Sequence, residues 1–271
     1  MLMLAFRFYG RFFYEIYLSF YMLKKRKQIV KYTLIIVLLL YLFCKIQIME
    51  NLLSALKISV PDKIFIKDPE TSVLGKKIIE QGIQLIDEIG FEAFTFKKLG
   101  AKISSNESSI YRYFESKHKL LLYLSSWYWA WIEYQLVIET FSISNADEKL
   151  EKAIDVVTRN VKEDDNFLHI NKPLLYNIII NESSKSFLTK EVDSDNKKGY
   201  FEVYKRVITR ISNIILEVNK KYPFALSLAS TIVIGSLHQH YLKYHFPLIT
   251  NYKTSETPTN FFIHLVKATI K

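Results

Sequence analysis

The stretch that decides the fold is residues 107–121, which read ESSIYRYFESKHKLL. Three aromatic rings, Tyr111, Tyr113 and Phe114, fall within four positions, with an arginine between them and Lys117 shortly after. A helix buried entirely in a core would not be expected to carry these hydroxyl and cationic groups, because burying them costs free energy. The stretch therefore predicts a helix that keeps part of its surface for a partner.

The residues around this stretch predict four helices, long, short, short and long. The first has apolar residues at helical spacing, which are Leu74, Ile78, Gly82, Leu85, Ile86 and Ile89. Gly90 is placed to end it, and Thr95 is placed to cap a short helix, FKKLGAKI. A second short helix runs from about Glu107 to Phe114 with Ile110 and Phe114 inward, and Ser116 caps the long fourth helix. Two short helices joined by a tight turn are typical of a helix-turn-helix.

Local charge supports contact with a polyanion. Between Thr95 and Lys119 there are six basic residues against Glu107 and Glu115. The chain as a whole carries +10, but residues 1–48 supply eight of its basic residues and one of its acids. The positive charge near the short helices, rather than the overall charge, indicates nucleic acid.

The segment IYRYFESKHKLL resembles the end of the DNA-binding domain in the TetR family of bacterial transcriptional regulators. The shared positions are Ile110, Tyr111, Tyr113, Phe114, Ser116, Lys117 and Leu120, with Gly90 and Thr95 upstream. The resemblance covers residues 72–125. The sequence departs from the family at two places. Leu99-Gly100 occupies the position of the family's usual Ile-Ala pair, and Ser104-Ser105 occupies the position of its turn glycine and the aliphatic residue that follows. Serine fits poorly where a turn needs a positive φ, which predicts a looser or altered turn.

The resemblance implies that the second short helix enters the major groove. It also implies that Tyr111 and Tyr113 reach phosphates and that Lys117 adds its charge at another. For Tyr113 the alternative is packing in the three-helix core. Asn106 and Lys97 join the set through their own polar chemistry. The predicted DNA-binding residues are Thr95, Lys97, Asn106, Ser108, Ser109, Tyr111, Arg112, Tyr113 and Lys117.

The C-terminal half reads as further helices, so we predict an all-α fold. Its domains are a helix-turn-helix at 72–120, after an irregular arm at 49–71, and a helical effector-binding and dimerisation domain at 121–271. The last helices, at 224–245 and 259–270, are implied by the resemblance to form a four-helix dimer interface. Ala229, Gly235 and Ser236 suit a close approach of helices, although an internal core helix is the alternative.

The first 48 residues stand apart. Tyr32 to Cys44 is a run of 13 residues without charge that follows Lys24–Lys27, whereas a membrane-spanning helix needs about 20. The run is either part of a single membrane segment at about 29–48 or an extension upstream of a true start at Met49. A membrane-anchored helical protein whose helix-turn-helix-like segment is structural is the alternative to a cytoplasmic regulator.

The sequence offers no sign of catalysis. It has one cysteine, no glycine-rich phosphate loop and no nucleophile motif. His238, His240 and His245 lack a nearby acid or cysteine to complete a metal site. We therefore expect no enzyme and no cofactor. The resemblance implies instead a regulator, in most cases of the family a repressor, that binds double-stranded DNA as a homodimer and responds to a small-molecule effector.

Overall fold

The computed structural model describes residues 36–41, 58–162, 169–182, 184–253 and 256–270. The chain divides into two units, Met1–Lys57 and Ile58–Lys271. In the first unit the described residues, 36–41, are helical, and the rest of the predicted apolar segment lies outside the described residues. The second unit carries all the other described residues.

The second unit is built of helices, and its described residues contain no strand. Two short 3₁₀ turns come first, η1 (Asp62–Ile64) and η2 (Pro69–Thr71). The helices that follow are α3 (Val73–Ala93), α4 (Phe96–Lys102), α5 (Glu107–Tyr111), α6 (Lys117–Thr140), α7 (Ala146–Thr158), α8 (Lys172–Glu182), α9 (Ser184–Phe187), α10 (Val192–Lys197), α11 (Glu202–Val218), α12 (Ala225–His245) and α13 (Thr259–Thr269), with a 3₁₀ turn η3 (Pro247–Ile249) before the last. The all-α prediction is confirmed.

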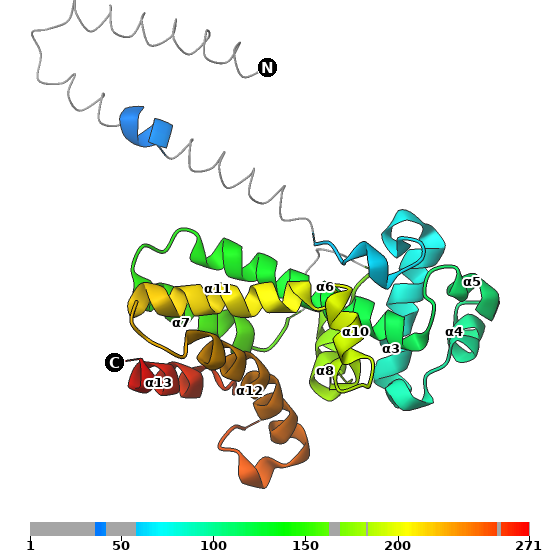
Figure 1. The fold of residues 1–271 in the computed structure, drawn as a ribbon. Helices are drawn as coiled ribbons and strands as arrows, with labels where there is room; N and C mark the ends of the chain where they lie inside the picture. The colour runs from blue at the N-terminus through cyan, green and yellow to red at the C-terminus, as the bar shows by residue number, and fades with distance from the viewer. Residues whose placement is uncertain (1–35, 42–57, 163–168, 183, 254–255, 271) are drawn as a thin grey trace, which may run out of the picture. The chain divides into compact units, whose positions relative to one another are not determined.

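We call α3 to α5 the head and α6 to α13 the body. The head packs α4 against α3 and α5 against α4 around fully buried apolar side chains, among them Ile83, Phe94, Leu99 and Ile110. In Figure 1, α4 and α5 lie at one end of the unit and α13 at the other. The head therefore projects two short helices from the body.

The described part of the arm, from Ile58 onward, is packed rather than irregular. Ile64 is buried in the core, and the Ile66 N–H donates to the Tyr113 carbonyl at 2.8 Å. Gly75 makes this packing possible at the start of α3, because a Cβ there would lie 2.2 Å from the Pro69 carbonyl oxygen. Close backbone contact, which the sequence pattern did not show, ties the arm to the head.

Gly90 ends the regular part of α3, as predicted. Its φ of 75° and ψ of 157° lie outside the helical region, in a conformation that glycine adopts without steric cost. Phe91 to Ala93 then form one further turn, closed by a bond from the Phe94 N–H to the Gly90 carbonyl. The kink turns the chain toward Thr95, where α4 begins.

The central helix of the body is α6. From Leu120 to Glu133 every residue is buried, because the helix contacts α7, α8, α9 and α11 on different sides. Its one buried acid, Glu133, accepts hydrogen bonds from Arg206 and Arg210 of α11. Burial alone raises the pKa of Glu133, but the two guanidinium groups outweigh it and hold the pKa below the usual range. A helix buried on all sides is the axis of the fold.

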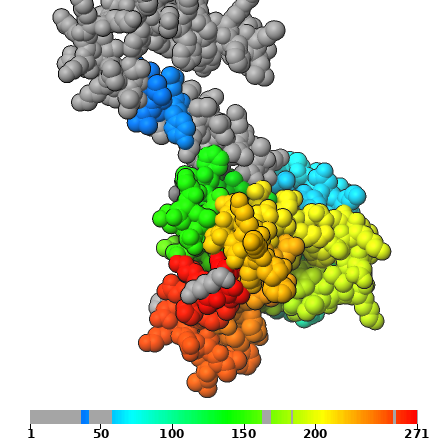
Figure 2. Space-filling view, turned by 60° about the vertical axis from the view of Figure 1, so that its left-hand side comes forward, coloured from blue at the N-terminus to red at the C-terminus, as the bar shows by residue number. Residues whose placement is uncertain are grey.

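The small residues of α12 serve contacts inside the subunit. Ala229 and Ser236 are fully buried, and a Cβ on Gly235 would lie 3.0 Å from the Phe262 ring of α13. Figure 2 shows residues of α12, η3 and α13, coloured orange to red, forming one continuous surface beside α11. The core-helix alternative therefore describes these three residues, and any dimer interface on this surface uses other side chains.

Candidate nucleic-acid interface and ligand cavities

The turn between α4 and α5 is tight. The Thr95 hydroxyl accepts a bond from the Lys98 N–H and so caps α4, as predicted. After Ile103 the chain reverses at Ser104, whose φ is 55°. The Ser105 N–H donates to the Gly100 carbonyl, and a Cβ on Gly100 would lie only 2.8 Å from the Ser105 oxygen. The prediction of a looser turn is wrong: the serine adopts the positive φ, and Gly100 admits the close approach.

The helix α5 presents the predicted polar face. Asn106 caps it, since its Oδ1 accepts from the Ser109 N–H at 2.9 Å and from the hydroxyls of Ser108 and Ser109. The Tyr111 ring lies edge-on to Phe96 with 5.0 Å between centroids, and the side chain is 47% exposed. Ile110 alone on this helix is buried. The remaining residues leave hydroxyl and amide groups at the surface, where a groove of DNA could meet them.

Two exposed cations flank this face without an internal partner. Lys97 on α4 and Arg112 after α5 are exposed, and neither forms an ion pair among the described residues. The neighbouring lysines differ, because Lys98 donates to the Ala93 carbonyl and Lys102 pairs with Glu88. Lys97 and Arg112 are therefore the side chains of the head best placed for phosphate.

Tyr113 lies in the core of the head. Its side chain is 4% exposed, and its hydroxyl bonds the Ser72 hydroxyl, which caps α3, at 2.8 Å. Phe114, which was expected inside, is fully buried beside it. The packing alternative thus describes the ring of Tyr113, and contact of its hydroxyl with DNA stays a prediction.

Lys117 has a structural role that sequence reasoning missed. Its Nζ donates to the carbonyls of Phe91, Glu92 and Phe94 at 3.0, 3.1 and 3.3 Å. These carbonyls close the turn after Gly90, where helix geometry leaves acceptors unpaired. An ammonium group has three N–H donors, and all three are used here. A phosphate contact by Lys117 stays a prediction, and it would compete with this clamp.

The same turn is joined to the body by α8. The Glu182 carboxylate accepts from the Phe91 N–H at 3.0 Å, and Lys185 pairs with both Glu182 and Glu92. We call this group the kink clamp: Lys117 from α6, together with Glu182 and Lys185 from α8 and α9, holds the Phe91–Phe94 turn. A movement of α8 or α9 would therefore change the contacts at the end of α3, next to α4.

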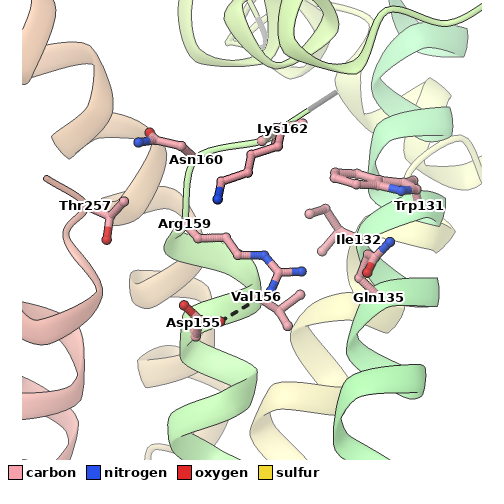
Figure 3. Close-up of a pocket in the computed structure, with 10 residues that line it drawn as sticks. Trp131, Ile132, Gln135, Asp155, Val156, Arg159, Asn160, Lys162 and Thr257 are labelled. Carbon is pink, nitrogen blue, oxygen red and sulfur yellow. Dashed lines mark hydrogen bonds and ion pairs between the residues drawn. The ribbon is translucent and has the colours of Figure 1, made fainter. Parts of the chain in front are cut away.

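The body contains a polar cavity of about 540 Å³ between α6 and α7 (Figure 3). Arg159 lies on its wall and pairs with Asp155 and with Glu139. Burial raises the pKa of Glu139, but bonds from Arg159 and Lys152 outweigh it and hold the pKa low. Because Arg159 is occupied by these carboxylates, Lys162 is the cation that faces this cavity without a carboxylate partner among the described residues.

A second cavity, of about 370 Å³, lies between α6, α9, α11 and α12. We call it the apolar cavity, because its walls are mainly hydrocarbon and aromatic rings, including Leu122, Trp129, Phe187 and Leu237. Small-molecule sites in proteins have this size and composition. The two cavities are thus chemically distinct, and both lie in the body.

Two absences concern the described residues alone. Among them, no group of three or more His, Cys, Asp or Glu side chains could hold a metal ion. No helix in the part of the chain that the structure describes is both long and apolar enough to cross a membrane.

Residues 78–124 match the family model of bacterial regulatory proteins of the tetR family. No curated protein sequence matches the chain. Among solved structures, AibR with isovaleryl coenzyme A and operator DNA has 16% identity and a TM-score of 0.46, with 71% of this chain and 96% of that chain covered. A tetR-family protein from Rhodococcus RHA1 has 15% identity and a TM-score of 0.49, covering 73% and 96%. A putative transcriptional regulator from Saccharomonospora viridis, solved with choline, has 15% identity and a TM-score of 0.48, covering 71% and 92%.

Proposed function

Because the chain carries the DNA-binding domain of the TetR family at residues 78–124, we propose that it is a transcriptional regulator that binds an operator as a dimer. The observation that supports this best is the exposed face of α5. Asn106, Ser108, Tyr111 and Arg112 are all exposed on it, while Ile110 alone fixes the helix to the core. A short helix held in this way is free to enter a major groove.

The exposed side chains suit two kinds of contact. Ser108, Ser109 and Tyr111 carry hydroxyls that can bond base edges or phosphates, and Thr95 offers another at the start of α4. Lys97 and Arg112 supply charge for phosphate. Because Asn106 already gathers the two serine hydroxyls, binding would exchange these internal bonds for bonds to DNA.

A dimer would present two such helices to successive major grooves, about 34–36 Å apart on a pseudo-palindromic operator. The surface that supports pairing is that of α12 and α13, where Leu226, Ile234 and Phe261 are exposed. Apolar side chains gathered on one surface are typical of a protein interface. The proposal implies a protein of the cytoplasm, where the chromosome lies, and a regulator rather than an enzyme.

An effector in the body would alter DNA affinity through a preference for one arrangement of the head. The kink clamp supports such a route, since Glu182 and Lys185 of the body hold the turn between α3 and α4. The mode of regulation that fits is a repressor released by its ligand.

The proposal is tested by selecting bound fragments from the source genome with the purified chain and measuring affinity against salt concentration. Lys97→Ala should weaken binding to all sequences and reduce the salt slope by about one. Arg112→Ala should cost about 1–3 kcal/mol and, if it reads a base, relax specificity at one position. Lys220→Ala removes an equal charge from an exposed site beyond α11 and is the matched control. Absence of DNA binding at low salt would overturn the proposal.

A further inference from the structure

The wall of the apolar cavity contains a buried hydroxyl that no other described residue satisfies. Ser125 of α6 lines the cavity and is 7% exposed, and its hydroxyl has no hydrogen-bond partner in the part of the chain that the structure describes. The adjacent Ser126 differs, because its hydroxyl donates to the Tyr200 carbonyl. A buried hydroxyl without a partner is unfavourable. A ligand with an oxygen beside it would therefore gain a hydrogen bond in addition to the burial of its apolar surface.

The charge along the walls excludes an ionic ligand. Lys205 is the one charged side chain among the described residues that line the cavity, and it is exposed and paired with Glu202 at 2.8 Å. Around Ser125 the walls are Leu122, Trp129 and the rings from α9 and α11. A carboxylate or ammonium placed beside Ser125 would lose its hydration, and the one nearby charge, on Lys205, is exposed and already paired with Glu202.

We propose that the apolar cavity binds a neutral, largely hydrocarbon ligand that carries one hydrogen-bonding oxygen, which bonds the Ser125 hydroxyl. This ligand class would be the effector of the regulator proposed above. Ligand binding itself does not depend on the proposed function, whereas the effect of the ligand on DNA affinity does. The polar cavity, with Arg159 and its two carboxylates, is not the site of this ligand.

The apolar cavity reaches the kink clamp through α9. Ser186 and Phe187 of this helix line the cavity, and the preceding Lys185 holds Glu92 of the head and Glu182 of α8. A ligand that displaces α9 acts directly on the contacts at the end of α3. Its binding therefore favours an arrangement of the head that differs from that of the empty protein.

The test uses three ligands of nearly the same shape: 4-propylphenol, propylbenzene and 4-propylbenzoate. Binding to the full chain is followed by calorimetry and by tryptophan fluorescence, to which Trp129 in the cavity wall contributes. The phenol should bind most tightly and the benzoate at least tenfold more weakly than the phenol, because its charge has no partner. A benzoate that binds as tightly as the phenol would overturn the neutral class.

Two serine variants isolate the hydrogen bond. Ser125→Ala should weaken 4-propylphenol by roughly fivefold, the value of one neutral hydrogen bond, and leave propylbenzene unchanged. Ser236→Ala is the matched control, because its hydroxyl is also buried and unpartnered but does not line the cavity. Ser125→Phe should fill the cavity and abolish binding of all three ligands, with the circular dichroism spectrum confirming that the variant folds. Equal effects of Ser125→Ala and Ser236→Ala would overturn the assignment.

The effect on DNA is measured separately, on operator fragments from the genome selection. Saturating 4-propylphenol should lower operator affinity at least fivefold in the wild-type chain and not in Ser125→Phe. An unchanged affinity would overturn the regulatory role of the cavity, whereas a chain that binds the phenol but no DNA would overturn the proposed function alone.

Discussion

The helices of the head and the last three helices of the body begin in different ways. The helices α3, α4, α5 and α6 each start at a side chain whose oxygen accepts a bond from a backbone N–H three residues later, at Ser72, Thr95, Asn106 and Ser116. The last three helices, α11, α12 and α13, start at Phe201, Phe224 and Pro258 with no such bond. In the body, α6 and α7 also begin at capping side chains, Ser116 and Asn145. Local hydrogen bonds therefore set the starts of the helices from α3 to α7, and contacts between helices set those of α11, α12 and α13.

The largest predicted effect on stability is at His240 of α12, whose hydrogen-bond partner lies far away in sequence. Its ring is 1% exposed and its Nε2 donates to the Thr158 carbonyl at the end of α7 at 2.8 Å. Burial, with a smaller contribution from Lys243, lowers the pKa of His240 from 6.5 to about 4, against the opposing effect of the Thr158 bond. The unfolded chain then binds a proton below pH 6.5 that the folded chain binds only below about 4.

Stability should therefore fall by about 3 kcal/mol as the pH drops from 7 to 4, from this residue alone. Urea unfolding of the wild-type chain and of His240→Gln at several pH values measures it. The variant removes the titrating ring, so the difference between the two curves should shrink through this window and level off below it. Parallel curves would show that His240 titrates alike in both states.

The head predicts a large effect from backbone contact rather than from side-chain packing. Gly75 and Gly82 both lie in α3, where alanine is favoured over glycine by about 1 kcal/mol. A Cβ on Gly75 meets the Pro69 backbone at 2.2 Å, whereas one on Gly82 lies 3.5 Å from the Leu120 methyl group. Gly75→Ala should destabilise the chain by about 2 kcal/mol and Gly82→Ala should stabilise it or leave it unchanged. Thermal unfolding compares them, and equal midpoints would contradict the close approach of the arm.

The capping bonds predict a smaller effect, of about 1 kcal/mol each. Asn106→Ala removes the acceptor for the Ser109 N–H and for two serine hydroxyls and should destabilise the chain by that amount. Asn106→Asp keeps the oxygen and should retain most of the stability, which makes it the control in urea unfolding. A loss as large for the aspartate would show that the cap is not what holds α5.

The same contrast explains what could be predicted from sequence. Thr95 as a cap, Gly90 as a helix end and Ile110 and Phe114 as core residues all follow from local signals, and the structure confirms each. The sequence around α11 has apolar residues at 201, 204, 208, 211, 215 and 218, a spacing that predicts one amphipathic stripe. The structure buries Ile211 and Ile215 of this stripe, and it also buries Val203, Val207 and Ile214, because α11 contacts α6, α7 and α12 and needs a wider apolar face.

The site shows the same limit. The polar face of α5 could be predicted from residue types, since Ser108, Tyr111 and Arg112 have no place in a small core. The engagement of Lys117 with three carbonyls could not, because its partners lie 23 to 26 positions away in sequence. The same holds for Ser125, whose unpartnered hydroxyl follows from how four helices meet around it.

The smallest predicted effect is a gain, at the turn between α4 and α5. Ser104 has a φ of 55°, and a residue with a Cβ pays roughly 1 kcal/mol to adopt the left-handed region. Ser104→Gly relieves this strain but gives the unfolded chain more freedom, so the net gain in stability should be about 0.5 kcal/mol. Ser105→Gly, one position later, has no positive φ to relieve and should destabilise the chain slightly. Urea unfolding of both variants compares them. If Ser104→Gly were less stable than Ser105→Gly, Ser104 would not adopt the positive φ that forms the turn between α4 and α5.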